Sequence, residues 1–203
     1  DVYKRQDQYG VPEFLNKRDA FLFKMYQAFG HHFDFIAIPI IKKRLRMDTS
    51  QVIINEERPQ LTKHLATRFK EKIGQNVNLL GEVVLGNGEA DHRYHHYLEA
   101  LESPDINYIS VKISGIYAQT HALNYEESFP KLVSRMSALY QKAIDFPYTD
   151  EDGIKRSKFI NLDMEEYKDA HFTLRLFKAV LNLPQFKNYS AGIVVQAYLP
   201  DAY

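Results

Sequence analysis

The sequence contains no cysteine and carries no net charge, and each absence excludes a class of protein. Without cysteine the chain can form neither a disulfide framework nor a thiol nucleophile, which suits a reducing compartment, so we expect a cytoplasmic protein. Lysine and arginine total 26, as do aspartate and glutamate, whereas a dedicated nucleic-acid-binding domain usually has a basic excess. We therefore expect no nucleic-acid partner for this segment.

Long apolar segments are missing as well. The longest unbroken apolar run covers only residues 35–41 and contains Pro39, whereas a helix that spans a membrane needs about 20 residues. No N-terminal segment has the charged-then-apolar layout of a signal peptide. Residues 1–12 show no usable periodicity, and no element is predicted for them.

The first third of the chain has the apolar periodicity of helices. Helices are predicted over 13–30, over 33–46 with an interruption at Pro39, and over 59–73. The second of these ends in four basic residues, Lys42, Lys43, Arg44 and Arg46. A basic helix C-terminus is favoured by the helix dipole, and we interpret this one as a solvated end.

From Val77 onward, strand-like and helical segments alternate. Strands are predicted over 77–83, 108–114, 159–166 and 192–198, and helices over 89–101, 125–144 and 170–181. A polar stretch, 147–157, is predicted to be a surface loop. Alternation of strands and helices indicates right-handed crossovers and a parallel sheet, and hence an α/β fold.

Each predicted strand ends in a polar residue while the neighbouring positions on its helix-facing side are apolar. These four residues are Glu82, Lys112, Asp163 and Gln196. If the sheet curls into a barrel, all four point into the mouth at the C-terminal edge of the strands, where the ligands of such folds bind. A buried polar cluster is costly, which favours a functional role over a structural one.

A cation and carboxylates at one mouth suit a small substrate that bears a carboxylate, held by Lys112. A phosphate would suit the lysine equally well. The segment Gly86-Asn87-Gly88 is too short for a nucleotide-binding phosphate loop.

With these residues in view, the chain resembles proline dehydrogenase as found in bacterial bifunctional proline utilisation flavoenzymes. The resemblance covers about residues 60–203 and is carried by NLLGEVVL (78–85), YISVKIS (108–114), INLDMEEY (160–167) and GIVVQAYL (192–199). It implies a partial (βα)8 TIM-like barrel, of which these are the first four parallel strands, preceded by N-terminal helices. The expected division is a helical lead-in over 1–75 and the barrel segment over 76–203.

The resemblance also implies FAD as cofactor and oxidation of L-proline to 1-pyrroline-5-carboxylate. Lys112 matches the lysine that pairs with the proline carboxylate, and Asp163 matches an aspartate beside flavin and substrate. Met164 and Gln196 match positions that contact the flavin. Tyr198 is expected to wall the flavin pocket, and Glu82 to support Lys112. Peripheral membrane or quinone contact is left open for the full-length enzyme.

The family's later strands and final helix carry an arginine near flavin N5, and a tyrosine and paired arginines that clamp proline. None of these lies within 1–203, so we expect a fragment, roughly the first half of the barrel, that binds flavin weakly or not at all by itself. Two other readings remain open. One is a barrel lyase or aldolase in which Lys112 forms a Schiff base, and the other is a non-catalytic half-barrel that docks on a partner.

Histidines and serines give weaker signals. His92 and His96 have the i, i+4 spacing of a zinc pair, next to His95, but the His-Glu-x-x-His pattern is absent, so no metal site is predicted. His31 and His32 are interpreted as a helix-end pair. Ser110 and Ser114 flank Lys112 without a histidine placed to activate them, which argues against a serine hydrolase.

Overall fold

The described residues of the computed structural model form two compact units. The division falls between Leu61 and Thr62, within helix α4, which spans Arg58–Lys70. Among the described helices, none combines the length and the apolar character needed to cross a membrane. The structure describes residues 11, 17–29, 34–50, 53–54, 58–79, 86–118 and 124–200.

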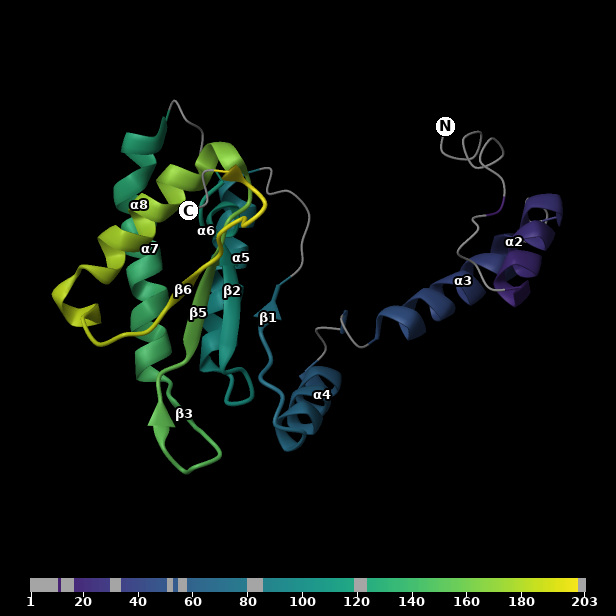
Figure 1. Cartoon of the computed structure of the whole chain (residues 1–203), viewed down its shortest axis with the longest axis horizontal. Helices are drawn as coiled ribbons and strands as arrows, with labels where there is room; N and C mark the ends of the chain where they lie inside the picture. The colour runs from purple at the N-terminus through teal and green to yellow at the C-terminus, as the bar shows by residue number, and fades with distance from the viewer. Residues whose placement is uncertain are drawn as a thin grey trace. The chain divides into compact units, whose positions relative to one another are not determined.

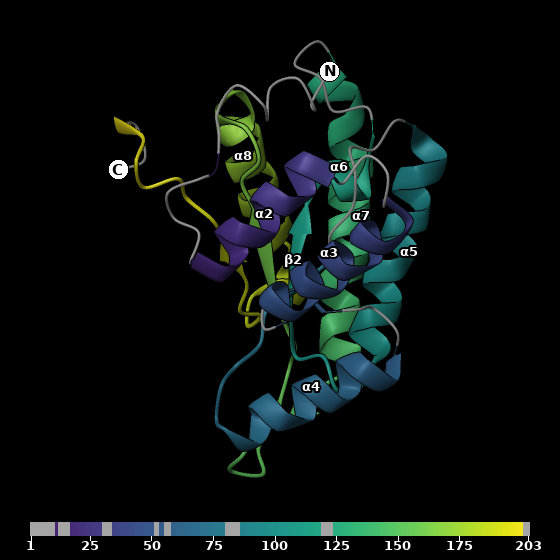
Figure 2. The same ribbon diagram turned by 90° about the vertical axis from the view of Figure 1, so that its right-hand side faces the viewer.

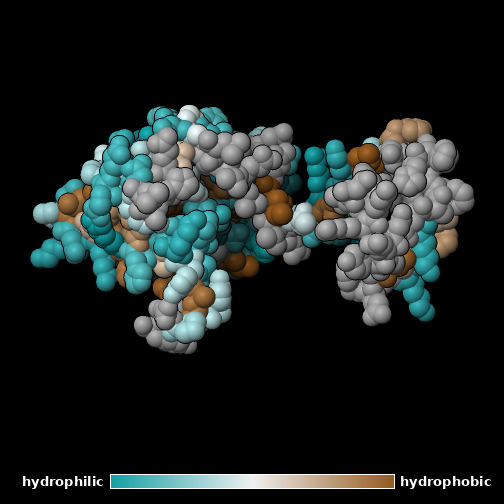
Figure 3. Space-filling model, turned by 90° about the horizontal axis from the view of Figure 1, so that it is seen from above, coloured by the Kyte–Doolittle hydropathy of each residue, from teal (hydrophilic) through white to brown (hydrophobic). Residues whose placement is uncertain are grey.

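The described part of the first unit is formed by α2, Lys17–Phe29, and α3, Asp34–Thr49. A salt bridge of 3.9 Å between Arg44 and Asp19 joins the two helices. α3 runs through Pro39, although an interruption was expected there; a proline removes one backbone hydrogen bond, and the rest of the helix is retained. Hydrophobic residues, brown in Figure 3, lie at the surface among hydrophilic ones.

The centre of the second unit is a parallel sheet of four strands (Figure 1). The strands are β1 (Val77–Asn78), β2 (Tyr108–Lys112), β5 (Phe159–Asp163) and β6 (Gly192–Ile193). Their order in space, β1-β2-β5-β6, is their order along the chain, and every pairing is parallel. The predicted parallel α/β fold is thereby confirmed.

Three long helices connect the strands and cover one face of the sheet (Figures 1 and 2). They are α5 (Asn87–Glu102), α7 (Tyr125–Asp145) and α8 (Ala170–Leu181). α5 packs on α7, and α7 on α8. Right-handed crossovers that always advance in the same direction place every helix on the same side of the sheet. The other face is therefore left to the polar residues of the strands.

Strand alternation divides the side chains between the two faces. On the helix side, the apolar residues of β2 and β5 are fully buried and meet the apolar stripe of α7; they are Ile109, Val111, Ile160 and Leu162 from the strands and Leu132, Met136 and Leu139 from the helix. Ser110 and Asn161 belong to the opposite face. This division is the one that the alternating sequences predict.

The ends of the strands depart from the prediction. β2 ends at Lys112, because the chain turns into a short helix, α6 (Ile113–Ile116), so Ser114 is not on the strand. β5 ends at Asp163 rather than 166. β6 was expected to reach 198, but it ends at Ile193, with one further bond from the Val194 N–H to the Leu162 carbonyl (2.9 Å). An edge strand has a partner on one side only and holds less of its length.

Two 3-10 helices and a hairpin complete the unit. The 3-10 helices are η3, Tyr167–Asp169, and η4, Pro184–Phe186. The expected polar loop is an antiparallel hairpin of β3 (Tyr148–Thr149) and β4 (Lys155–Arg156). Its turn needs Gly153, whose φ of 78° is one that other residues rarely adopt.

Candidate active site

Lys112 and Asp163 lie side by side at the C-terminal edge of the sheet. They are register partners on β2 and β5, and register partners on neighbouring parallel strands point to the same side. Both side chains are partly exposed. The Lys112 ammonium makes no hydrogen bond or ion pair within the described parts of the chain, not even with Asp163. A cation and a carboxylate are thus level on neighbouring strands, with no bond between them.

The carboxylate of Asp163 is held by two asparagine amides. Asn161 Nδ2 donates to its Oδ1 at 3.0 Å, and Asn78 Nδ2 donates to its Oδ2 at 3.3 Å. Asn161 comes from the same strand, whereas Asn78 is 85 positions away on β1. Each carboxylate oxygen therefore accepts a bond from a neutral donor, which fixes its direction without neutralising its charge.

A polar layer lies one step below this pair. Asn78, Ser110, Asn161 and Gly192 are aligned across the four strands by the sheet register. Ser110 is 2% exposed and accepts a bond of 2.8 Å from Asn76 Nδ2. A Cβ atom at Gly192 would lie 2.5 Å from Asn161 Oδ1, so the amide occupies the space of a side chain there. This polar layer supports the side chain of Asp163 from the N-terminal side.

Glu165 is a second carboxylate at this edge, and the sequence reading did not single it out. Its carboxylate accepts bonds from the backbone N–H and the hydroxyl of Ser114, at 3.2 and 2.9 Å. Ser114 is available for these bonds because it lies in the α6 turn rather than at the end of β2. The acidic run Asp163-Met164-Glu165-Glu166 was the sequence feature that could have indicated this role. Nothing in the run shows which of its carboxylates would accept hydrogen bonds from the residues after β2.

Tyr97 of α5 lies behind the same edge and was also missed. It is 2% exposed, and the Lys112 backbone is close enough to offset part of the rise in its pKa. Burial raises the pKa of Tyr97, which keeps the phenol neutral. Its ring takes the space beside Gly115, where a Cβ would lie 2.9 Å from the hydroxyl oxygen. Tyr97 therefore supports the backbone that carries Lys112.

The other expected site residues do not all lie on strands. Gln196 lies beyond β6 in a turn, where its carbonyl accepts from the Leu199 N–H at 3.0 Å. The register makes Val194, not Gln196, the continuation of β6 level with Asp163. Met164 follows β5 directly and is partly exposed, and Tyr198 is 78% exposed. Glu82 lies outside the described residues.

A second lysine contrasts with Lys112 at the opposite end of the sheet. Lys158 precedes β5, is 2% exposed, and donates to the Ser103 carbonyl. Burial lowers its pKa to about 8, partly offset by Asp105. A lysine with a lowered pKa is what Schiff-base chemistry uses, but this one lies at the N-terminal end of the strands, away from Asp163.

The histidine pair has the geometry of ring packing. His92 and His96 have ring centroids 4.2 Å apart on α5, and the described residues contain no group of three or more His, Cys, Asp or Glu that could hold a metal. His31 and His32 lie outside the described residues.

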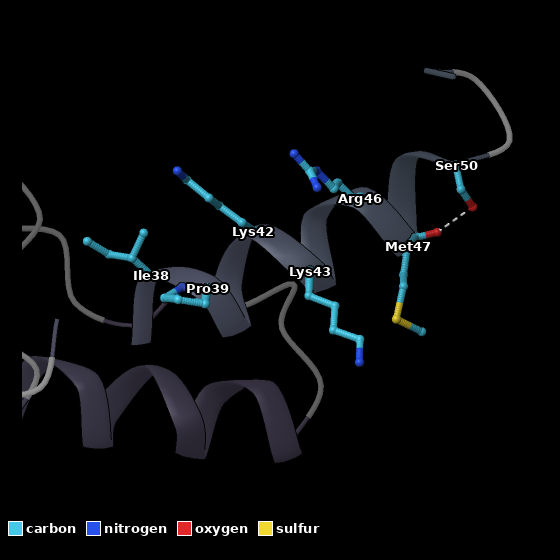
Figure 4. A pocket seen from close by; sticks show the side chains of 7 residues that line it. All are labelled: Ile38, Pro39, Lys42, Lys43, Arg46, Met47 and Ser50. Atoms are coloured by element: carbon cyan, nitrogen blue, oxygen red, sulfur yellow. Dashed lines mark hydrogen bonds between the residues drawn. The ribbon is translucent and has the colours of Figure 1, made fainter. Parts of the chain in front are cut away.

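Two surface hollows have linings that include neither Lys112 nor Asp163. One follows a single helix, α3, where Lys42 and Arg46 extend to one side and Lys43 and Met47 to the other (Figure 4). The second, about 310 Å³, lies at the N-terminal end of the strands and includes Tyr108, Tyr148 and Phe159. Neither contains a predicted site residue.

Comparisons with known proteins agree with this architecture. A family profile described as "Proline dehydrogenase" matches residues 61–203. The solved structure of Proline Utilization A (PutA) from Corynebacterium freiburgense matches 95% of the chain at 34% identity, with a TM-score of 0.69. PutA from Bdellovibrio bacteriovorus, solved after inactivation by N-propargylglycine, matches 81% at 28% identity and a TM-score of 0.68.

The chain spans 18% of the length of each of these two PutA structures. No curated protein matches the chain.

Proposed function

The chain belongs to the proline dehydrogenase family, and from that premise we propose that it forms part of an FAD-dependent enzyme that oxidises L-proline to 1-pyrroline-5-carboxylate. In this proposal the four strands are the first half of a (βα)8 barrel that begins near residue 76, after the lead-in helix α4. The observation that carries it is the pair Lys112 and Asp163, level on adjacent strands and not bonded to each other.

Lys112 binds the carboxylate of proline. Its ammonium has no bond within the described residues, and its side chain is partly exposed, so it can meet an anionic group without breaking an internal ion pair. A hydrogen bond to a charged group contributes about 1.5–3 kcal/mol. That bond fixes one end of a small substrate at the edge of the sheet.

Asp163 orients the other end of the substrate. Its carboxylate is directed by Asn161 and Asn78, and it lies within one strand spacing of Lys112, about 4.8 Å in a sheet. Proline carries a carboxylate and a secondary ammonium. When the carboxylate of proline bonds to Lys112, its ammonium nitrogen lies near the carboxylate of Asp163. The arrangement suits an amino acid, which carries both charges.

We expect four residues to contact the flavin ring: Asp163, Met164, Gln196 and Tyr198. Asp163 supplies an acceptor, Gln196 an amide, and Tyr198 an exposed aromatic face, while Met164 continues the β5 backbone past the carboxylate. FAD, when bound, supplies an acceptor for the hydride that leaves the proline carbon next to nitrogen. The described residues include no glycine-rich loop for its phosphates. L-Proline and FAD are the proposed partners, and a cytoplasmic location and quinone contact stay predictions.

The test is turnover of proline by a protein that carries this segment within a complete barrel. Lys112→Ala and Asp163→Ala are each expected to lower kcat/KM by about 10- to 150-fold, the loss of one charged hydrogen bond. Lys155→Ala, in the exposed hairpin, is the matched control and should leave turnover unchanged. Full activity in both site variants would contradict the assignment.

A covalent reagent gives a second readout. N-Propargylglycine inactivated the PutA from Bdellovibrio bacteriovorus, and we expect it to inactivate the complete enzyme here, with proline protecting. Borohydride with a keto-substrate tests the Schiff-base alternative, because it would trap a covalent adduct on Lys112. Trapping on that lysine, with no flavin absorbance, would favour a lyase instead.

A further inference from the structure

We propose that Asn161 is a positioning residue whose amide holds the Asp163 carboxylate away from Lys112 and so keeps the lysine available for an anionic ligand. The effect of Asn161 on the Asp163 carboxylate is argued from geometry alone, whereas its consequence for proline rests on the proposed function. Asn161 lies two residues before Asp163 on the same face of β5 and is 9% exposed. It touches the carboxylate directly and acts on the substrate only through it.

Both amide donors pull the carboxylate in one direction. Asn161 and Asn78 belong to the polar layer one step closer to the N-terminal end of the sheet, and they bond to different oxygens of Asp163. The carboxylate is therefore drawn back toward that layer. A third donor from the side of Lys112 is not needed to satisfy it.

Without this hold, Lys112 and Asp163 should form an ion pair. Neighbouring strands lie about 4.8 Å apart, well within the reach of a lysine side chain, and the two residues are register partners on one face. No such bond is present in the described part of the chain. An internal pair would compete with any anionic ligand for the ammonium, so the asparagine prevents self-inhibition of the site.

Gly192 leaves the space that the Asn161 amide oxygen occupies. The Oδ1 atom occupies the position next to the Gly192 Cα, 2.5 Å from where a Cβ would lie, and this leaves Nδ2 directed at Asp163. A Cβ there would also come within 3.0 Å of the Phe159 ring. The lack of a side chain at position 192 therefore makes room for this orientation of the Asn161 amide.

The experiment measures how fast Lys112 reacts with acetic anhydride at neutral pH, by mass spectrometry of the 203-residue chain. In Asn161→Ala the freed carboxylate pairs with Lys112, and its labelling rate should fall about three- to fivefold, the effect of a partly exposed ion pair. Lys155, in the exposed hairpin, is the internal reference. Asn76→Ala is the matched control, because Asn76 bonds to Ser110 and not to Asp163.

Two further variants keep the test decisive. In an Asp163→Ala background, Asn161→Ala should have no effect on Lys112, because the two residues act through one contact. Should Asn161→Ala not fold, as judged by circular dichroism, Asn78→Ala removes the other donor at an exposed position and should lower labelling in the same direction. Unchanged Lys112 labelling in the folded donor variants would overturn the proposal.

The consequence for the reaction is measured separately. In a complete barrel, Asn161→Ala should raise KM for proline by the same three- to fivefold factor, with a smaller change in kcat, because the lysine is occupied in the free enzyme. If neither the wild-type protein nor any variant oxidises proline, the proposed function is wrong. The labelling rates still show whether Asn161 keeps the Asp163 carboxylate away from Lys112. A fall in kcat alone would contradict the proposal.

Discussion

The two ends of the parallel sheet treat a lysine in opposite ways. At the N-terminal end, Lys158 is 2% exposed and donates to Ser103, its backbone N–H bonds to Ala143 at 3.0 Å, and its carbonyl accepts from the Tyr189 hydroxyl at 3.0 Å. At the C-terminal end, Lys112 is partly exposed and has no such bond in the described residues.

The difference between the two lysines is the number of internal contacts that each side chain and its backbone make. Lys158 connects a loop, helix α7 and the segment before β6, so its contacts hold the unit together. The Lys112 side chain makes no such contact within the described residues, so its charge is available to a ligand. In barrels the N-terminal ends of strands serve stability and the C-terminal ends serve chemistry, and this is the division that we propose for the two lysines.

The largest expected effect is on pH-dependent stability at the N-terminal end. Burial lowers the pKa of Lys158 to about 8, below its value in the unfolded chain, so folding carries a penalty below pH 8 that disappears as pH rises toward about 10.5. The wild-type free energy of unfolding should therefore rise over that window, by up to about 3 kcal/mol. In Lys158→Met this rise should be absent. Urea unfolding at several pH values measures both.

Two buried tyrosines change the free energy of unfolding with pH in the opposite direction, so their contribution must be subtracted. Burial raises the pKa of Tyr140 and of Tyr189, so the unfolded chain loses these protons first and stability falls above about pH 10. The difference between wild type and Lys158→Met cancels this contribution. Equal slopes in the two proteins between pH 8 and 9.5 would break the contrast between the lysines.

The next largest effect on stability is expected at the C-terminal end of the sheet, where Tyr97 packs against Gly115. Gly115→Ala places a Cβ 2.9 Å from the Tyr97 hydroxyl, and overpacking of this kind costs about 1–3 kcal/mol. Tyr97→Phe removes the nearest atom, so the double variant should regain part of the loss. A Gly115→Ala protein as stable as wild type in urea would show that Tyr97 is not held tightly behind Lys112.

A smaller effect is expected at the aromatic cluster near Lys158. The Tyr140 hydroxyl is buried with no partner among the described residues, so Tyr140→Phe should be neutral or stabilise by up to about 1 kcal/mol. Tyr189→Phe loses a bond to the Lys158 carbonyl and should destabilise by about 1 kcal/mol. Thermal unfolding of the two variants, side by side, distinguishes the paired hydroxyl from the unpaired one.

The smallest effect is predicted for stability at Lys112. Lys112→Met removes a partly exposed charge with no described partner, so the free energy of unfolding should change by less than about 0.5 kcal/mol. The same substitution should abolish most proline turnover in a complete barrel. A large loss of stability would mean that Lys112 has a structural role after all.

Much of this architecture is visible in the sequence because it depends on local alternation. Ile109 and Val111 alternate with Ser110 and Lys112, and that pattern alone predicts which face each residue takes. The helices after Gly86, Asn124 and Asp169 follow equally well from their apolar spacing. The placement of Lys112 and Asp163 on one face follows from the same alternation on two neighbouring parallel strands.

What the sequence does not reveal depends on contacts between distant segments. The bond from Asn78 to Asp163 joins residues 85 apart, and nothing near either residue announces it. The early end of β6 depends on the lack of a strand along its outer edge in the described chain, so GIVVQAY looks like a longer strand than it is. Ser114 looked like a strand residue because the α6 turn depends on Gly115 making room for Tyr97.

The match between strand order and chain order has a consequence for how the sheet is made. Since β2 pairs with β1, β5 with β2 and β6 with β5, each strand leaving the ribosome finds its neighbour already synthesised. The sheet can therefore grow from one edge during translation, without waiting for distant sequence. Lys112 and Asp163 would meet while β6 is still in the exit tunnel, so the C-terminal edge of β2 and β5 forms before the last of these strands has emerged from the ribosome.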